Sequence, residues 1–138
     1  MQIRNATEQD LDWLMFVAKH AYENGTYDEE AGKNYWKQIM SNPSCKLLRG
    51  DKAAMGAIIV SMPYAPSKKF AALLPVMSLG NSASELMKMT RMLIEWAKNE
   101  GASRFDFSAI TGVDLGPLAK RFGGVPISPA YTVRLSHV

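Results

Sequence analysis

Residues 73–111, which read LLPVMSLGNSASELMKMTRMLIEWAKNEGASRFDFSAIT, decide the fold class of this chain. The segment predicts the end of a strand over 70–77, a helix over 84–100 that ends at Gly101, and a second strand over 103–111. A helix that connects two strands in this way is typical of a parallel crossover within one sheet. The helix is amphipathic, and its apolar stripe consists of Leu86, Met89, Leu93 and Ala97.

A loop of small residues joins the first strand to this helix. The first N–H groups of a helix lack partners and carry the positive end of the helix dipole, so such a junction is suited to holding a phosphate group. Serine is also a good N-cap, which the helix needs in any case. Both interpretations stay open for the loop residues Gly80, Asn81, Ser82, Ala83 and Ser84.

The segment before this unit predicts a short strand at 1–7 and then two helices. Thr7 is the expected N-cap of a helix over 7–25. Asp10 follows three residues later, close to the capping-box pattern, in which the side chain at this position bonds to the backbone N–H of the N-cap. The second helix is expected over 27–43 and has acids in its first turn. Acids there interact favourably with the positive end of the helix dipole, and they could also attract a cationic amine. These acids are Asp28, Glu29 and Glu30.

Three antiparallel strands follow the two helices. Residues 45–51 and 53–62 read as a hairpin with turn residues at 50–52. Residues 64–69 contain the next turn signals, and 70–77 form the third strand, which leads into the crossover. The antiparallel part of the sheet therefore comes before the parallel unit in the chain.

The last part of the chain predicts a short helix and a final strand. The helix covers 114–124, with Pro117 near its start, and the strand covers 125–135, where two prolines favour an edge or a bend. The full order is βααβββαβαβ, an α/β (α+β) fold with a mixed, mostly antiparallel sheet. We expect a single domain over 1–138, because the chain is long enough for one core and short for two.

Composition and charge exclude several classes of protein. No apolar stretch is long enough to span a membrane, and the first ten residues lack the apolar run of a signal peptide, so we expect a cytoplasmic location. Cys45 is the only cysteine and the two histidines are far apart in sequence, which argues against a disulfide or a metal site. A net charge of +3 from scattered basic residues makes nucleic-acid binding unlikely.

Several segments together resemble the GCN5-related N-acetyltransferases, the GNAT family. IRNATEQDLDWL at 3–14 is similar to the family opening I-R-x-A-x-x-x-D-x-x-x-L. MLIEWAKNEGASRFDFSA at 92–109 is similar to the third helix and fifth strand of the family, and LGPLAKRFGG at 115–124 to its short fourth helix. The resemblance covers essentially the whole chain and implies a sheet whose fourth and fifth strands splay apart.

The resemblance also implies acetyl-CoA as cofactor, with no metal. In the family the cofactor lies between the splayed strands, and a Q/R-x-x-G-x-G/A loop holds its pyrophosphate; without gaps this motif falls on Asn81, Ser84 and Leu86, a departure from the pattern. A shift of one or two residues would bring in Gly80, Ser82 or Ala83. The cofactor-binding residues expected from the resemblance are Leu74, Val76, Ser78, Leu79, Gly80, Asn81, Ser82, Ala83 and Ser84.

The residues that catalyse acetyl transfer in the family are not found here. Ala119 stands where the resemblance implies a tyrosine acid, and Gly112 stands where it implies an asparagine. The strands within 53–79 contain no Asp or Glu that could serve as base. The catalytic residues therefore stay unknown, and the weak substitutes are Asp106, Ser108, Tyr64, Tyr131 and His20.

Two functions remain open from the sequence. The first is an acetyl-CoA-dependent N-acetyltransferase that acts on an unknown amine. The second is a catalytically silent protein of the same fold with a binding or structural role, of the kind that bacteriophages encode, located in the host cytoplasm or the virion. The partners expected are acetyl-CoA with an amine substrate, or a protein partner, and a homodimer is a further option.

Overall fold

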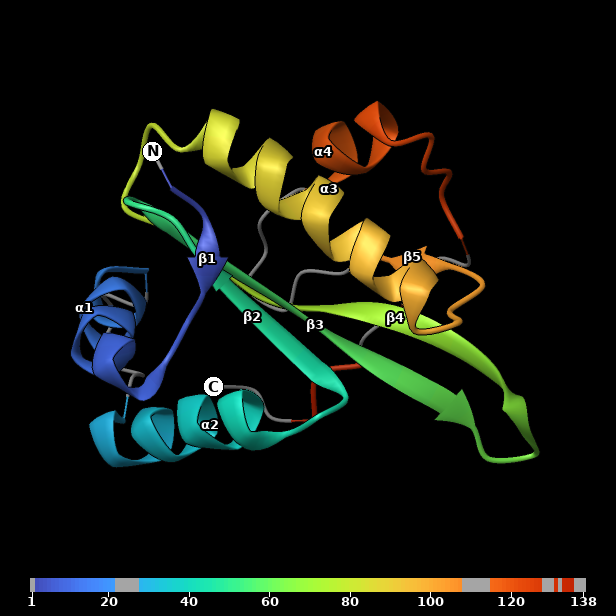
Figure 1. Ribbon diagram of the computed structural model, residues 1–138, viewed down its shortest axis with the longest axis horizontal. Helices are drawn as coiled ribbons and strands as arrows, with labels where there is room; N and C mark the ends of the chain where they lie inside the picture. Colours follow the sequence, from blue (N-terminus) through green and yellow to red (C-terminus); the bar gives the residue numbers. More distant parts are fainter. Residues whose placement is uncertain (1, 22–27, 108–114, 128–130, 132, 136–138) are drawn as a thin grey trace.

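The described residues form one mixed sheet of five strands. The computed structural model describes residues 2–21, 28–107, 115–127, 131 and 133–135. Within this part the strands lie side by side in chain order; β1 to β4 pair antiparallel, and β5 pairs parallel with β4 (Figure 1). The strands are β1 Arg4–Asn5, β2 Cys45–Arg49, β3 Ala53–Met62, β4 Ala65–Ser78 and β5 Phe105–Asp106.

Helices cover both faces of the sheet. On one face α1 (Leu11–Ala21) and α2 (Glu29–Ser41) bury a cluster that includes Leu14 and Trp36. On the other face α3 (Ala83–Asn99), with α4 (Gly116–Arg121) beside it, buries a second cluster that includes Leu93 (Figure 1). Both clusters contain residues of β2 and β3, so the sheet separates two cores.

The predicted crossover is confirmed. α3 begins one residue before the expected start and connects β4 to the parallel strand β5. Its apolar stripe lies in the second core, where Met89 and Leu93 are fully buried. Phe105 and Phe107 pack against the same core, as their alternation predicts.

The helix starts expected from the acids are confirmed in part. Asp28 is the N-cap of α2, and its carboxylate accepts the Ala31 N–H at 3.0 Å. Asp10 accepts the Thr7 N–H at 2.8 Å, but it ends a short 3-10 turn, η1 (Glu8–Asp10), that precedes α1. The end expected for this helix at 22–25 lies outside the described residues.

The turn expected at 64–69 is shorter than its composition suggested. β4 already begins at Ala65, which pairs with Met62, so β3 and β4 form a long hairpin. Pro66 is tolerated in the strand because the register of the pair is irregular next to it, at Ser61 and Met62.

The final strand expected over 125–135 is absent from the described residues of that stretch. Positions 125–127, 131 and 133–135 have no strand pairing, and positions 128–130 and 132 lie outside the described part. The prolines at 126 and 129 remove N–H donors from any ladder there, which gives a physical reason. The apolar side chains of this stretch are largely exposed.

Candidate cofactor-binding site

Past its described pairing with β5, β4 has an edge without a described neighbour, which we call the open edge of β4. The two strands pair at Ala71 with Phe105 and at Ala72 with Asp106, and β4 continues to Ser78 without a described neighbour on that side. Residues 73–78 therefore present backbone groups that no described strand covers. Residues 108–111, which were expected to continue the fifth strand along this edge, lie outside the described part of the chain.

A bulge lies within the same part of β4. Met55 pairs with Val76 and Ala57 with Leu73, so Gly56 alone faces two residues of β4. A Cβ on Gly56 would meet Leu47 Cδ1 and Lys46 O at 3.2 Å each, so glycine suits this crowded position. A bulge bends its strand. Pro75 is one of the two bulged residues, and because proline has no backbone N–H, its place in the bulge costs the strand no hydrogen bond.

The side chains of the expected β4 residues are used for packing. Leu74 and Leu79 pack against the α1 and α2 core, whereas Val76 packs against the α3 core. Successive side chains of a strand point to the two faces of the sheet, so the open edge offers main-chain groups to a ligand. The residue types at these positions consequently carry little information about binding.

The loop after β4 turns through a left-handed conformation. Gly80 has φ +106° and Asn81 has φ +50°, which glycine and asparagine adopt more readily than other residues. The Gly80 N–H donates to Ser78 Oγ at 2.9 Å, and the Ser78 and Ser82 hydroxyls hydrogen-bond to each other. Nothing lies within 4 Å of the place where a Gly80 Cβ would be.

This loop presents the free N–H groups at the start of α3. Within the described chain, the backbone N–H groups of residues 82–85 have no hydrogen-bond acceptor, and the helical pattern begins with Leu86 N–H to Ser82 O at 2.9 Å. Ser82 stands at the N-cap position, but its hydroxyl bonds to Ser78 and makes no cap bond. The loop therefore suits a phosphate group, because these donors lack acceptors within the described chain and Ala83 and Ser84 are exposed.

The bulky residue that departs from the family motif does not block the loop. Leu86 is half-buried and packs against the α3 core. The predicted loop residues, Gly80 to Ser84, are thus brought together around the helix start with no large side chain among them.

A buried acid that the sequence reasoning missed lies in the same turn. Glu85 is only 4% exposed, and its carboxylate accepts backbone N–H groups of Lys52 and Ala53 in the turn between β2 and β3. The partners are more than 30 positions apart in the chain, so no local pattern could have indicated the contact.

The weak substitutes for an acid or base are placed poorly. The Asp106 carboxylate accepts a hydrogen bond from Arg104 Nε at 3.1 Å, and Arg104 lies over the ring of Phe70. Tyr64 at the tip of the β3–β4 hairpin and Tyr131 are 81% and 90% exposed, and His20 lies near the end of α1. Ala119 lies in α4, while Ser108 and Gly112 fall outside the described residues.

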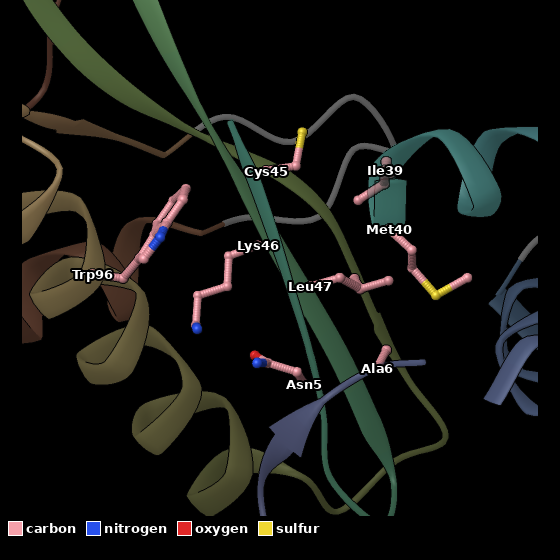
Figure 2. Close-up of a pocket in the computed structure, with 8 residues that line it drawn as sticks. All are labelled: Asn5, Ala6, Ile39, Met40, Cys45, Lys46, Leu47 and Trp96. Atoms are coloured by element: carbon pink, nitrogen blue, oxygen red, sulfur yellow. The ribbon is translucent and has the colours of Figure 1, made fainter. Parts of the chain in front are cut away.

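A separate pocket of about 260 Å³ lies beside β2, on the far side of β3 and β4 from β5. Figure 2 shows Asn5, Lys46 and Trp96 on one side of the strand and Ile39, Met40 and Leu47 on the other. The pocket therefore lies away from the open edge of β4.

Comparison with solved structures identifies the fold. Over the whole chain, an aminoglycoside 6'-N-acetyltransferase from Acinetobacter haemolyticus is similar, with 15% identity, 99% of that protein covered and a TM-score of 0.72. The chain has the GNAT fold. Similar values hold for glucosamine-6-phosphate N-acetyltransferase from Arabidopsis thaliana, with 13% identity, 98% of each chain covered and a TM-score of 0.72.

A third structure with the GNAT fold contains the expected cofactor. It is an acetyltransferase from Clostridium acetobutylicum with acetyl-CoA, 14% identical, with 99% of each chain covered and a TM-score of 0.71. No family model matches the sequence, and no curated protein matches it. The likeness is therefore one of fold, and it confirms the architecture that the motifs implied.

Metal binding and membrane crossing each require a particular arrangement of residues in the described part of the chain. Among these residues, no three or more His, Cys, Asp or Glu side chains gather in a way that could hold a metal ion. The helices that the structure describes all fall short of the length and apolar content that crossing a membrane would require.

Proposed function

We propose that this protein is an acetyl-CoA-dependent N-acetyltransferase that acts on an amine in the cytoplasm. The observation that carries the proposal is the continuity of two features: the part of β4 that has no described neighbour on the β5 side runs directly into a loop whose four N–H groups at 82–85 have no acceptor within the described chain. The first feature suits the amide-containing pantetheine arm of CoA, and the second suits its pyrophosphate. The GNAT fold of the chain supports the same assignment.

The chain supplies binding and orientation in this proposal. When bound, acetyl-CoA supplies a thioester whose acetyl group passes to the amine nitrogen, while the sulfur leaves and is protonated. The backbone of 73–78 holds the pantetheine arm as an added strand, and the N–H groups of 82–85 hold the pyrophosphate. With the Asp106 carboxylate hydrogen-bonded to Arg104, solvent water takes the proton that the amine gives up.

Thermal unfolding with and without cofactor tests this proposal. A ligand at 100 times its Kd that binds only the folded protein adds about 2.7 kcal/mol to the free energy of unfolding. For a domain of this size we expect acetyl-CoA and CoA each to raise Tm by several degrees. Adenine alone should have little effect, because the proposed contacts are to pyrophosphate and pantetheine. A flat profile up to millimolar acetyl-CoA would contradict the assignment.

A second candidate is a protein of this fold that binds CoA without transferring the acetyl group. The observations that favour it are Ala119 at the position of the family acid and the ion pair that engages Asp106. Release of the CoA thiol in the presence of a panel of primary amines separates the two. Thiol release that depends on the amine supports the enzyme, and a Tm shift without thiol release supports the silent protein.

A further inference from the structure

The strongest unexplained feature is the burial of Glu85 beside the proposed cofactor loop. Carboxylates are rarely buried unless they are paired, and this one is 4% exposed. Oε1 accepts the N–H groups of Lys52 at 3.0 Å and Ala53 at 3.2 Å, and Oε2 accepts that of Lys52 at 3.2 Å. The carboxylate thus bonds to the β2–β3 turn, away from the free N–H groups of its own helix.

The same turn holds the other end of the loop. The Lys52 carbonyl accepts the Leu79 N–H at 2.8 Å, at the point where β4 ends. The main chain of one residue, Lys52, therefore bonds to both ends of the segment 79–85. The loop between these two attachments contains the left-handed residues Gly80 and Asn81.

The carboxylate of Glu85 lies so close to Gly50 that position 50 has no room for a side chain. A Cβ on Gly50 would lie 2.0 Å from Glu85 Oε1 and 2.8 Å from its Cδ. Met89 Cε is 3.2 Å from the same point. Any side chain at position 50 would consequently displace Glu85 from the turn, so Gly50 and Glu85 fit each other.

We propose that Glu85 is a positioning residue that fixes the pyrophosphate loop by bonding it to the β2–β3 turn. This inference rests on the proposed function. A loop that binds through its backbone N–H groups needs them held in one arrangement before the ligand arrives, because ordering them on binding lowers affinity. The bonds from Glu85 and Leu79 to Lys52 hold the two ends of that arrangement.

Two variants test the contact from opposite sides. Glu85→Ala removes the carboxylate, and Gly50→Ala places a methyl group against it. We expect each to raise the Kd for CoA at least tenfold, measured by titration calorimetry at a temperature where the variant is folded. Glu85→Gln should stay within threefold of the wild type, because the amide oxygen can take the place of Oε1 and accept both N–H groups.

The double variant distinguishes a specific contact from general damage. In Gly50→Ala combined with Glu85→Ala, the carboxylate that the methyl group would displace is gone, and the flexible end of Met89, 3.2 Å away, needs to shift only slightly, so the Kd should be close to that of Glu85→Ala alone. A fully additive loss would overturn the inference. Leu14→Ala, in the other core, serves as the control for lost stability, and it should leave the Kd within twofold.

Hydrogen exchange of the loop amides provides a readout without ligand. Exchange of residues 80–86 should accelerate in Glu85→Ala and stay unchanged in Leu14→Ala and Glu85→Gln. If the wild type does not bind CoA, the proposed function fails whatever Glu85 does. If the wild type binds and Glu85→Ala binds equally well, the proposed function stands and the positioning role is wrong.

Discussion

At the scale of single residues, Asp10 connects three parts of the chain. Its carboxylate pairs with the Arg4 guanidinium at 2.6 Å, accepts the Thr7 N–H, and lies 3.1 Å from Arg49, whose guanidinium stacks on Trp13 at 3.7 Å. The hydrogen bonds from Arg4, followed by those from Thr7 and Arg49, hold the pKa of Asp10 well below its usual range against the opposing effect of burial. The side chain thus stabilises the fold in its ionised form.

We predict that Asp10→Asn lowers the free energy of unfolding by about 1–3 kcal/mol at pH 7. Because the folded pKa lies below the unfolded value of about 3.9, the wild-type advantage is complete above that value and is lost as the pH falls. Urea titrations of both proteins between pH 7 and pH 2 measure the difference. A gap that stayed constant over this range would show that the ionised carboxylate is not its source.

At the scale of elements, the N–H groups in the first turn of α3 are also the groups that are proposed to bind the pyrophosphate. Ser84 is exposed in the first turn, so its side chain can be changed without disturbing the hydroxyl pair of Ser78 and Ser82. An acid there interacts favourably with the helix dipole. A bound pyrophosphate, in contrast, would be repelled by it.

We predict that Ser84→Asp leaves the unliganded protein as stable as the wild type or up to about 1 kcal/mol more stable. The same variant should weaken CoA binding at least fivefold, and the loss should shrink at high salt because exposed charges are screened. Ser84→Asn is the matched neutral control and should bind as the wild type does. Equal Kd values for the Asp and Asn variants would place the pyrophosphate elsewhere.

At the scale of the whole molecule, a single sheet carries two cores. The α1 and α2 core and the α3 core both contain residues of β2 and β3. If these strands unfold, the apolar side chains of both cores are therefore exposed. This arrangement favours unfolding in one step, as expected for a single domain.

We predict one calorimetric transition with an unfolding enthalpy of about 100 kcal/mol near 60 °C for a chain of this length. Leu14→Ala and Leu93→Ala remove buried side chains from opposite faces, and each should cost about 2–5 kcal/mol. Both should lower the Tm of the same transition. Two separate peaks, with each variant moving only one of them, would mean that the two cores unfold independently.

Local sequence determined the elements because their signals lie within a few residues. The spacing of Met89 and Leu93, the acid Asp28 at its helix start, and Gly101 at the end of the crossover helix each act within one or two turns. Together with the family motifs, these signals predicted the order of the described elements from β1 to α4. The same local signals suggested Gly80 to Ser84 as a phosphate site, and that assignment stays a prediction.

Only the tertiary structure decided how that loop is held and which of its groups stay free. No local pattern singled out Glu85, yet it is buried against Lys52 and Ala53, and Ser82 could have served as a cap, yet its hydroxyl bonds to Ser78. The bulge opposite Gly56 and the early start of β4 likewise depend on the register of two paired strands. Such contacts join residues distant in the chain, and their energies depend on burial and distance, which no local pattern of residue types specifies.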